Sequence, residues 1–120
     1  MRIRTKRVYE AAEPEDGLRV LVDRLWPRGV RKDAIDLWLK DIAPSGALRT
    51  WFGHEPERWA AFRSRYHKEL QANPNAIADL KKAGRGKTVT PLYGARDETH
   101  NQAVALADYL KPKRTKKKKA

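Results

Sequence analysis

The sequence predicts a small, single-domain α/β fold with a short, mainly parallel sheet, a helical crossover and a C-terminal helix. Two runs, residues 18–25 and 88–93, have the near-continuous apolar character of strands that are buried on both faces. A long stretch with helical periodicity separates them, and strands joined by such a crossover pair in parallel. A chain of 120 residues fits one domain.

The first two strands are indicated by their patterning and by the turn residues around them. Residues 3–9 alternate apolar and polar side chains imperfectly, which predicts a strand near a sheet edge. The acidic segment 11–17, with its proline and glycine, is expected to form a loop. Strand 18–25 should end at Trp26–Pro27, because proline lacks the N–H that a sheet ladder needs, and Gly29 permits a sharp loop.

Two helical stretches are expected to open the crossover. Residues 33–42 place apolar side chains at positions i, i+3, i+4 and i+7, which predicts a helix that ends before Pro44. Ser45 is a good N-cap for a short helix through Phe52, and Gly53 suits its C-terminus.

Two further helices and a last strand complete the expected chain path. Pro56 fits the first turn of a longer helix, and Asn73–Pro74 ends that helix and begins a shorter one. Pro91 lies inside strand 88–93 and argues against a fully paired central position, at least on one side. Thr99, with Gln102 three residues later, indicates a capping box at the start of the last helix.

Composition excludes several classes of site. The chain has no cysteine, so disulfides and cysteine-ligated metal centres are excluded. The three histidines lie far apart in the sequence, and no metal site is predicted. No apolar run approaches the roughly 20 residues of a membrane span, and no apolar segment of a signal peptide follows the basic N-terminus. We therefore expect a cytoplasmic protein without a membrane partner.

Positive charge is concentrated at the C-terminus. The chain has a net charge of +12, and the seven Lys and Arg of residues 111–120 leave +5 for residues 1–110. Like charges repel and this segment has no apolar side chain of note to bury, so it is expected to be a disordered Lys-rich tail behind a domain at 1–110.

Charged side chains follow both predicted buried strands. Ligands of open α/β sheets bind beyond the carboxyl ends of the strands, so these segments are expected to face one crevice. The predicted ligand-binding residues are Arg24, Trp26, Arg28, Tyr93, Arg96, Asp97 and Asn101. The predicted catalytic residues, should a reaction occur, are Asp23 and His100.

The expected ligand of this crevice is a small anion or the anionic group of a larger molecule. Arg28 and Arg96 offer planar guanidinium groups that match phosphate or carboxylate, and the N–H groups of a helix N-terminus favour anions. Asp23 would orient an arginine or act as a base, and Tyr93 and Asn101 would donate hydrogen bonds.

Structural roles for the same residues stay open beside these functional ones. Asp23 and Arg24 would pair to fix a loop, and Asp97 would cap the last helix. His100 would be a solvated residue of the first helical turn, and Trp26 would pack within its loop.

Three blocks of the chain resemble a known family. The stretch LRVLVDRLWPRG, the block LRTWFGHEPERWAAFRSRYHKEL and the closing TPLYGARDETHNQAVALADYL are similar to the YeaO-like proteins, a bacterial domain family of unknown function. The similarity spans roughly residues 1–110 and leaves out the tail. It implies a compact bacterial α/β domain and brings no reaction, cofactor or oligomeric state with it.

Three functions stay open at this point. The first is an anion-binding domain, with or without catalysis. The second is a nucleic-acid-associated or regulatory protein whose basic surface and tail contact phosphates without sequence preference. The third is a protein-interaction module with an exposed aromatic helical face around Trp51 and Trp59.

Overall fold

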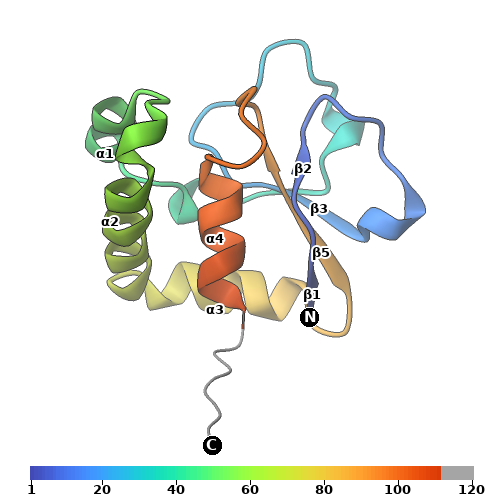
Figure 1. Cartoon of the computed structure of the whole chain (residues 1–120). Helices are drawn as coiled ribbons and strands as arrows, with labels where there is room; N and C mark the ends of the chain where they lie inside the picture. The colour runs from blue at the N-terminus through green and yellow to red at the C-terminus, as the bar shows by residue number, and fades with distance from the viewer. Residues whose placement is uncertain (112–120) are drawn as a thin grey trace, which may run out of the picture.

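A parallel sheet of five short strands forms the centre of the molecule in a computed structural model that describes residues 1–111 (Figure 1). The strands are β1 (Arg2–Ile3), β2 (Lys6–Arg7), β3 (Leu18–Leu21), β4 (Leu37–Trp38) and β5 (Thr88–Tyr93). β5 and β3 pair in the middle, β4 flanks β3, and β1 and β2 follow one another along the other side of β5. The predicted fold class and the parallel pairing of the two buried strands are confirmed.

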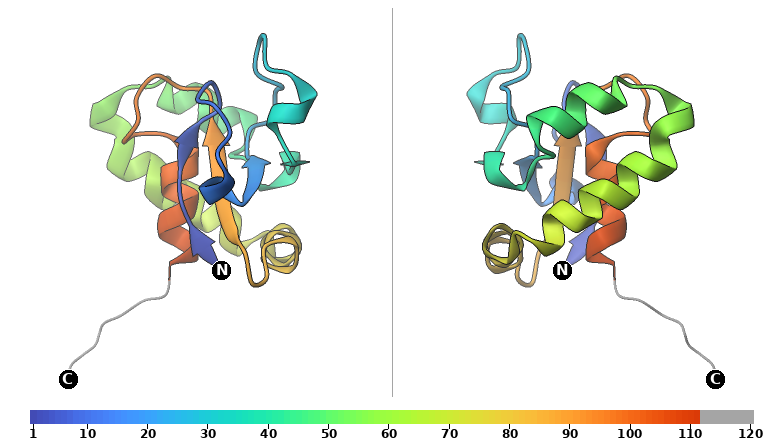
Figure 2. Two further views of the ribbon diagram at one scale, coloured as in Figure 1. Left: turned by 90° about the vertical axis from the view of Figure 1, so that its right-hand side faces the viewer. Right: turned by 90° about the vertical axis from the view of Figure 1, so that its left-hand side faces the viewer.

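Four α-helices cover one face of the sheet and its lower end (Figure 1, Figure 2). They are α1 (Gly46–Phe52), α2 (Trp59–Gln71), α3 (Pro74–Ala83) and α4 (Gln102–Leu110). Val20, Val22, Val89 and Tyr93 form the sheet side of the core, and the helices contribute Phe62, Tyr66 and Leu106 among others. The hydroxyl of Tyr66 donates to the carbonyl oxygen of Ile42 at 2.6 Å, so this buried polar atom is satisfied.

A buried charge cluster joins the opposite face of the sheet to the segment 9–17 that lies over it. Asp16 has no exposed surface and accepts from Arg19 at 2.7 Å, from Lys6 at 3.1 and 3.2 Å and from the backbone N–H of Glu13 at 3.0 Å. Burial alone would raise the pKa of Asp16, but these hydrogen bonds lower it below its ordinary value. Thr90 of β5 donates to the backbone carbonyl of Asp16 at 2.7 Å, which fixes the segment to the sheet.

The gap between β1 and β2 lies opposite Pro91. Arg4 and Val8 donate from their backbone N–H groups to the carbonyls of Val89 and Tyr93. Alternate residues of a strand direct their polar groups to the same side, so the nitrogen of Pro91 also faces this edge and has no hydrogen to donate. The predicted edge strand at residues 3–9 is therefore realised as two short pieces. Strand β5 is central, although the ladder on this one side is interrupted as Pro91 indicated.

The helix predicted at residues 33–42 is wrong. The segment forms a 3₁₀ turn (Lys32–Ala34), strand β4 and a second 3₁₀ turn (Lys40–Ile42). Asp36 exchanges two contacts with Arg19 of β3, because its N–H donates to the Arg19 carbonyl and its carboxylate accepts the Arg19 N–H at 2.8 Å. Pairing with the sheet edge outweighs the helical spacing of the apolar side chains.

The predicted helix ends are partly confirmed. The hydroxyl of Ser45 accepts the N–H of Leu48 at 3.2 Å, and Gly53 ends α1 in the left-handed conformation. The capping box predicted from Thr99 and Gln102 is wrong, because Asn101 is the N-cap of α4 and accepts the N–H of Val104 at 3.0 Å. The disorder predicted for the tail falls on residues 112–120, which lie outside the described part of the chain, and the domain boundary at 110 stays a prediction.

Candidate functional site

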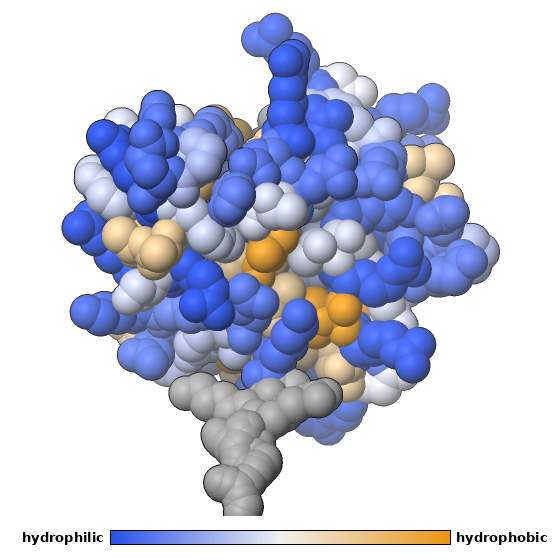
Figure 3. All heavy atoms as spheres, in the orientation of Figure 1, coloured by the Kyte–Doolittle hydropathy of each residue, from blue (hydrophilic) through white to orange (hydrophobic). Residues whose placement is uncertain are grey.

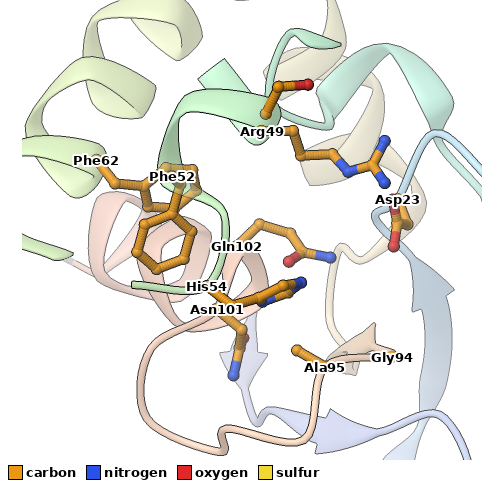
Figure 4. Close-up of a pocket in the computed structure, with 10 residues that line it drawn as sticks. Asp23, Arg49, Phe52, His54, Phe62, Gly94, Ala95, Asn101 and Gln102 are labelled. Atoms are coloured by element: carbon orange, nitrogen blue, oxygen red, sulfur yellow. The ribbon is translucent and has the colours of Figure 1, made fainter. Parts of the chain in front are cut away.

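A pocket of about 410 Å³ lies where the carboxyl ends of β3 and β5 meet the start of α4 (Figure 4). Asp23 follows β3, Gly94 and Ala95 follow β5, and Asn101 and Gln102 begin α4. All strands are parallel, so their carboxyl ends lie at one edge of the sheet, where ligands of such folds bind. The pocket therefore occupies the place where the two charged segments of the sequence are expected to face one another.

The other wall of the pocket comes from α1 and the turn behind it. Arg49, Thr50 and His54 supply polar groups there, and Phe52 and Phe62 supply an aromatic floor with ring centroids 4.3 Å apart. Sequence reasoning missed these polar residues, because Arg49 and Thr50 have the spacing of an ordinary solvated helix face. The one signal for His54 is its position directly after Gly53, where the chain must leave the helix.

Polar side chains converge on the pocket from both walls. In Figure 4 the Arg49 side chain extends toward Asp23, and the Gln102 amide and the His54 ring point into the space between the walls. The Asp23 carboxylate accepts the N–H of Arg24 at 2.8 Å, which holds it at the end of β3. The pocket thus offers guanidinium, imidazole, amide and hydroxyl donors together with one carboxylate.

The start of α4 is firmly positioned. Asn101 is 1% exposed, and its side chain donates to the carbonyl of Asp97 at 2.9 Å while accepting from Val104. The predicted ligand-binding residue Asn101 lines the pocket, but both ends of its amide are already engaged within the protein. The first N–H groups of α4 have no partner within the helix, and they give this side of the pocket a partial positive charge.

Asp97 and His100 organise the turn before α4. One Asp97 oxygen accepts the N–H groups of Thr99 and His100 at 2.9 and 3.0 Å, and the other lies 2.8 Å from the His100 ring. These hydrogen bonds, led by that from Thr99, hold the pKa of the Asp97 carboxyl well below its ordinary range. The His100 ring also packs edge-on against Trp59, with centroids 5.3 Å apart. Both residues act on the loop, and neither lines the pocket.

Arg24, Trp26 and Tyr93, which were also predicted, do not line the pocket, and Trp26 lines another one. Arg24 donates to the carbonyl of Pro44 at 2.9 Å and forms no ion pair with Asp23. Trp26 donates to the carbonyl of Val30 and packs edge-on against Trp38, which is the loop packing expected as its structural role. Tyr93 is buried in the core, and burial raises the pKa of its hydroxyl.

The two arginines that were predicted to bind the anion, Arg28 and Arg96, lie in different places. Arg28 and Arg96 are both exposed, and residues 7–9 anchor the loops that carry them. Tyr9 donates to the carbonyl of Arg28 at 3.1 Å, and Arg7 donates to the carbonyl of Ala95 at 3.1 Å. Arg96 lines a second pocket beside the first, whereas Arg28 lines neither.

Comparison with known proteins gives the chain a family. A family model described as the inactive DUF488-N3 subclade matches residues 2–120. The chain belongs to the inactive DUF488-N3 subclade.

Relatives of this member of the subclade are found in Mycobacterium tuberculosis and in Escherichia coli. An uncharacterised protein of Mycobacterium tuberculosis (strain H37Rv) is 47% identical over 111 residues, covering 91% of the chain and 93% of that protein. The uncharacterised protein YeaO of Escherichia coli K12 is 44% identical over 113 residues, covering 92% of the chain and 98% of YeaO. The predicted YeaO-like family is thereby confirmed. No solved structure matches the chain significantly.

The part of the chain that the structure describes contains neither a metal-binding cluster nor a membrane-spanning helix. Within residues 1–111 no group of three or more His, Cys, Asp or Glu side chains could hold a metal ion. No helix in the same part of the chain is long and apolar enough to cross a membrane. The cytoplasmic location stays a prediction.

Proposed function

We propose that this domain binds a small molecule with a phosphate or carboxylate group in the pocket between the strand ends and α4. The convergence of Arg49, His54 and the α4 N-terminus on one 410 Å³ pocket is the observation that carries the proposal. A guanidinium group binds such an anion through two parallel hydrogen bonds, and unpaired helix N–H groups add to the attraction. Binding without catalysis is favoured by the description of the family as an inactive subclade.

The other groups of the pocket restrict the kind of ligand. Asp23 repels a bare anion but accepts a hydrogen bond from a hydroxyl or amino group, and Gln102 both donates and accepts. Phe52 and Phe62 give the floor an apolar character that suits a carbon skeleton. The proposed ligand is therefore an organic molecule with an anionic group and a further polar group. Arg28 stays a sequence-based prediction as an anion ligand.

Calorimetric titration with Arg49→Ala tests this proposal. The parent is first screened by thermal shift against inorganic phosphate, small carboxylates and nucleoside monophosphates, and each stabilising compound is then titrated. A hydrogen bond to a charged group contributes about 1.5–3 kcal/mol, so Arg49→Ala should weaken binding roughly 10- to 150-fold.

Arg85→Ala is the matched control, because Arg85 is an exposed arginine in the turn before β5, at the opposite end of that strand. The Arg85→Ala variant should bind each compound with the same affinity as the parent protein. Arg28→Ala belongs in the same series and measures whether that arginine contributes. Equal binding by parent and Arg49→Ala, or no stabilising compound in the panel, would exclude an anion site here.

Nucleic-acid association stays a prediction. Its main basis is the basic tail, of which residues 112–120 lie outside the described part of the chain. Steeply salt-dependent binding that disappears on deletion of residues 111–120 would assign it to the tail alone.

The described surface gives little support to the interaction-module alternative. Trp51 and Trp59 are half-buried, and the guanidinium groups of Arg58 and Arg65 lie over Trp51 at 5.4 and 4.1 Å from its ring centroid. Figure 3 shows mostly hydrophilic side chains on the face it draws, with only small hydrophobic areas. Trp51 and Trp59 therefore do not form a fully exposed aromatic surface.

A further inference from the structure

A second pocket of about 430 Å³ adjoins the first. It is lined by His54, Gly94, Ala95, Arg96 and Asp97, and the first three of these residues also line the first pocket. Because the same side chains border both, the two pockets are neighbouring parts of one depression beyond the carboxyl end of β5.

Two of the residues that the pockets share, Gly94 and Ala95, are small. Gly94 has no side chain, and a Cβ built on it would meet no heavy atom within 4 Å, so the space beside it is open. Ala95 contributes only a methyl group, and its carbonyl already accepts a hydrogen bond from Arg7 at 3.1 Å. A short linker can therefore pass from one pocket to the other along residues 94–95.

Each pocket contains one arginine with an uncommitted guanidinium group. Arg49 lines the first and Arg96 lines the second, and both are exposed. Among residues 1–111 neither forms an ion pair or a side-chain hydrogen bond, whereas Arg19 and Arg63 are paired with carboxylates. These two cations are available to a ligand.

The carboxylate beside Arg96 is already engaged elsewhere. Asp97 accepts hydrogen bonds from Thr99 and His100 with both of its oxygens, so it is turned toward its own loop. It therefore does not compete with a ligand for the Arg96 guanidinium by direct pairing.

We propose that the ligand carries two anionic groups on a short linker, one bound by Arg49 and the other by Arg96, with His54 between them. This inference rests on the proposed function and adds the class of ligand: a dicarboxylate, or a carboxylic acid that also bears a phosphate. Joining two anionic groups makes the second contact intramolecular, which raises affinity only when the linker matches the separation of the two sites.

The proposal is tested by measuring how affinity depends on the chain length between the two anionic groups of a ligand. Calorimetry would compare the dicarboxylates from malonate to suberate with monocarboxylates of the same chain length on the parent protein. The expected result is an affinity maximum at one intermediate length, at least tenfold above the matched monocarboxylate. Equal affinities of the two series at every length would overturn the proposal.

Variants then assign the second anionic group to Arg96. Arg96→Ala should weaken the best dicarboxylate at least tenfold more than the matched monocarboxylate, and Arg85→Ala should change neither. Arg96→Gln keeps the polar stem and should behave in the same way, which guards against a local folding defect in the alanine variant. Equal weakening of both ligand classes by the two Arg96 variants would contradict the assignment.

The outcomes separate the two proposals. If Arg49→Ala weakens both ligand classes while chain length has no effect, the anion site stands and the two-anion ligand fails. If no compound with a carboxylate or phosphate group binds to the parent at all, both fail. Tight binding of an oligonucleotide without binding of any dicarboxylate would also exclude the small two-anion ligand.

Discussion

His54 combines an unusual backbone conformation with a place in both pockets. Its φ of 59° lies in the left-handed region, and it is the one non-glycine residue with positive φ among residues 1–111. This conformation costs an L-residue roughly 1–2 kcal/mol, although histidine tolerates it better than most. Gly53, with a φ of 53°, precedes it, so two successive left-handed residues turn the chain from α1 toward the pocket.

Substitutions at His54 should separate backbone strain from side-chain contacts. His54→Gly removes the strain and is expected to unfold with a free energy at or above that of the parent. His54→Val should lower the free energy of unfolding by about 1–2 kcal/mol, because a β-branched side chain is poorly tolerated at positive φ. Guanidinium denaturation of both variants provides the measurement. A valine variant as stable as the glycine variant would show that the turn relaxes.

At the scale of elements, the start of α4 shows how a local motif can mislead. Thr99 and Gln102 have the spacing of a capping box, yet Thr99 donates to Asp97 within a tight turn. Asn101 begins the helix instead, because its buried amide reaches Asp97 on one side and Val104 on the other. The 97–100 turn, in which the Asp97 carboxylate accepts the N–H groups of Thr99 and His100, decides which polar residue is placed at the cap.

Alanine substitutions can distinguish the two caps. Asn101→Ala should lower the free energy of unfolding by about 1–2 kcal/mol, because it removes the cap of α4 and leaves the carbonyl of Asp97 without its donor. Thr99→Ala is the matched control and should cost under about 0.5 kcal/mol, since its hydroxyl is exposed. Thermal denaturation followed by circular dichroism would measure both. A larger loss for Thr99→Ala than for Asn101→Ala would restore the sequence-based capping box.

For the whole molecule, the Asp16 cluster ties β2, β3 and β5 to the segment that covers them. Arg19 is 4% exposed and is compensated by Asp16, whereas Lys6, 8% exposed, pairs with both Asp16 and Glu13. Gly17 next to it has a φ of 62°, and a Cβ there would overlap the backbone of Thr88. The tight approach of this segment to β5 therefore requires glycine at that position.

Asp16→Asn should destabilise the whole domain by about 3–5 kcal/mol at neutral pH, because the buried Arg19 loses its counter-charge and Lys6 keeps only its ion pair with Glu13. The hydrogen bonds to Asp16 keep its pKa in the folded state below the ordinary carboxyl value of about 3.9. Its stabilisation is thus fully present above that value and is lost as the pH falls through the lower folded-state pKa.

Denaturant unfolding at pH 7 and at pH 3 or below measures this contribution. The difference in unfolding free energy between the parent and Asp16→Asn should shrink as the solution is acidified. Glu15→Gln is the control, since Glu15 is the exposed neighbour and should show little effect at either pH. A parent–Asp16→Asn difference that is the same at both pH values would refute the linkage.

The sequence by itself determined the family and the fold class, and it predicted the region of the candidate site. Buried parallel strands need apolar side chains on both faces, so the apolar runs within residues 18–25 and 88–93 predicted the two central strands, although β3 ends at Leu21 rather than at Leu25. Strand-end charge then marked Asp23, and the polar start of the last helix marked Asn101; both residues line the first pocket. These features are local, and local patterns suffice to predict them.

Only the tertiary structure decided the secondary structure of residues 33–42 and showed which residues form the second wall of the pocket. An apolar stripe at helical spacing is compatible with a short strand between two turns, and pairing of Asp36 and Leu37 with β3 selects the strand. Arg49 and His54 reach the pocket because α1 packs across the strand ends, at a distance in sequence that no motif spans. The physical reason in both cases is the same: the decisive contacts join residues far apart in the chain, and their energies exceed the local preferences.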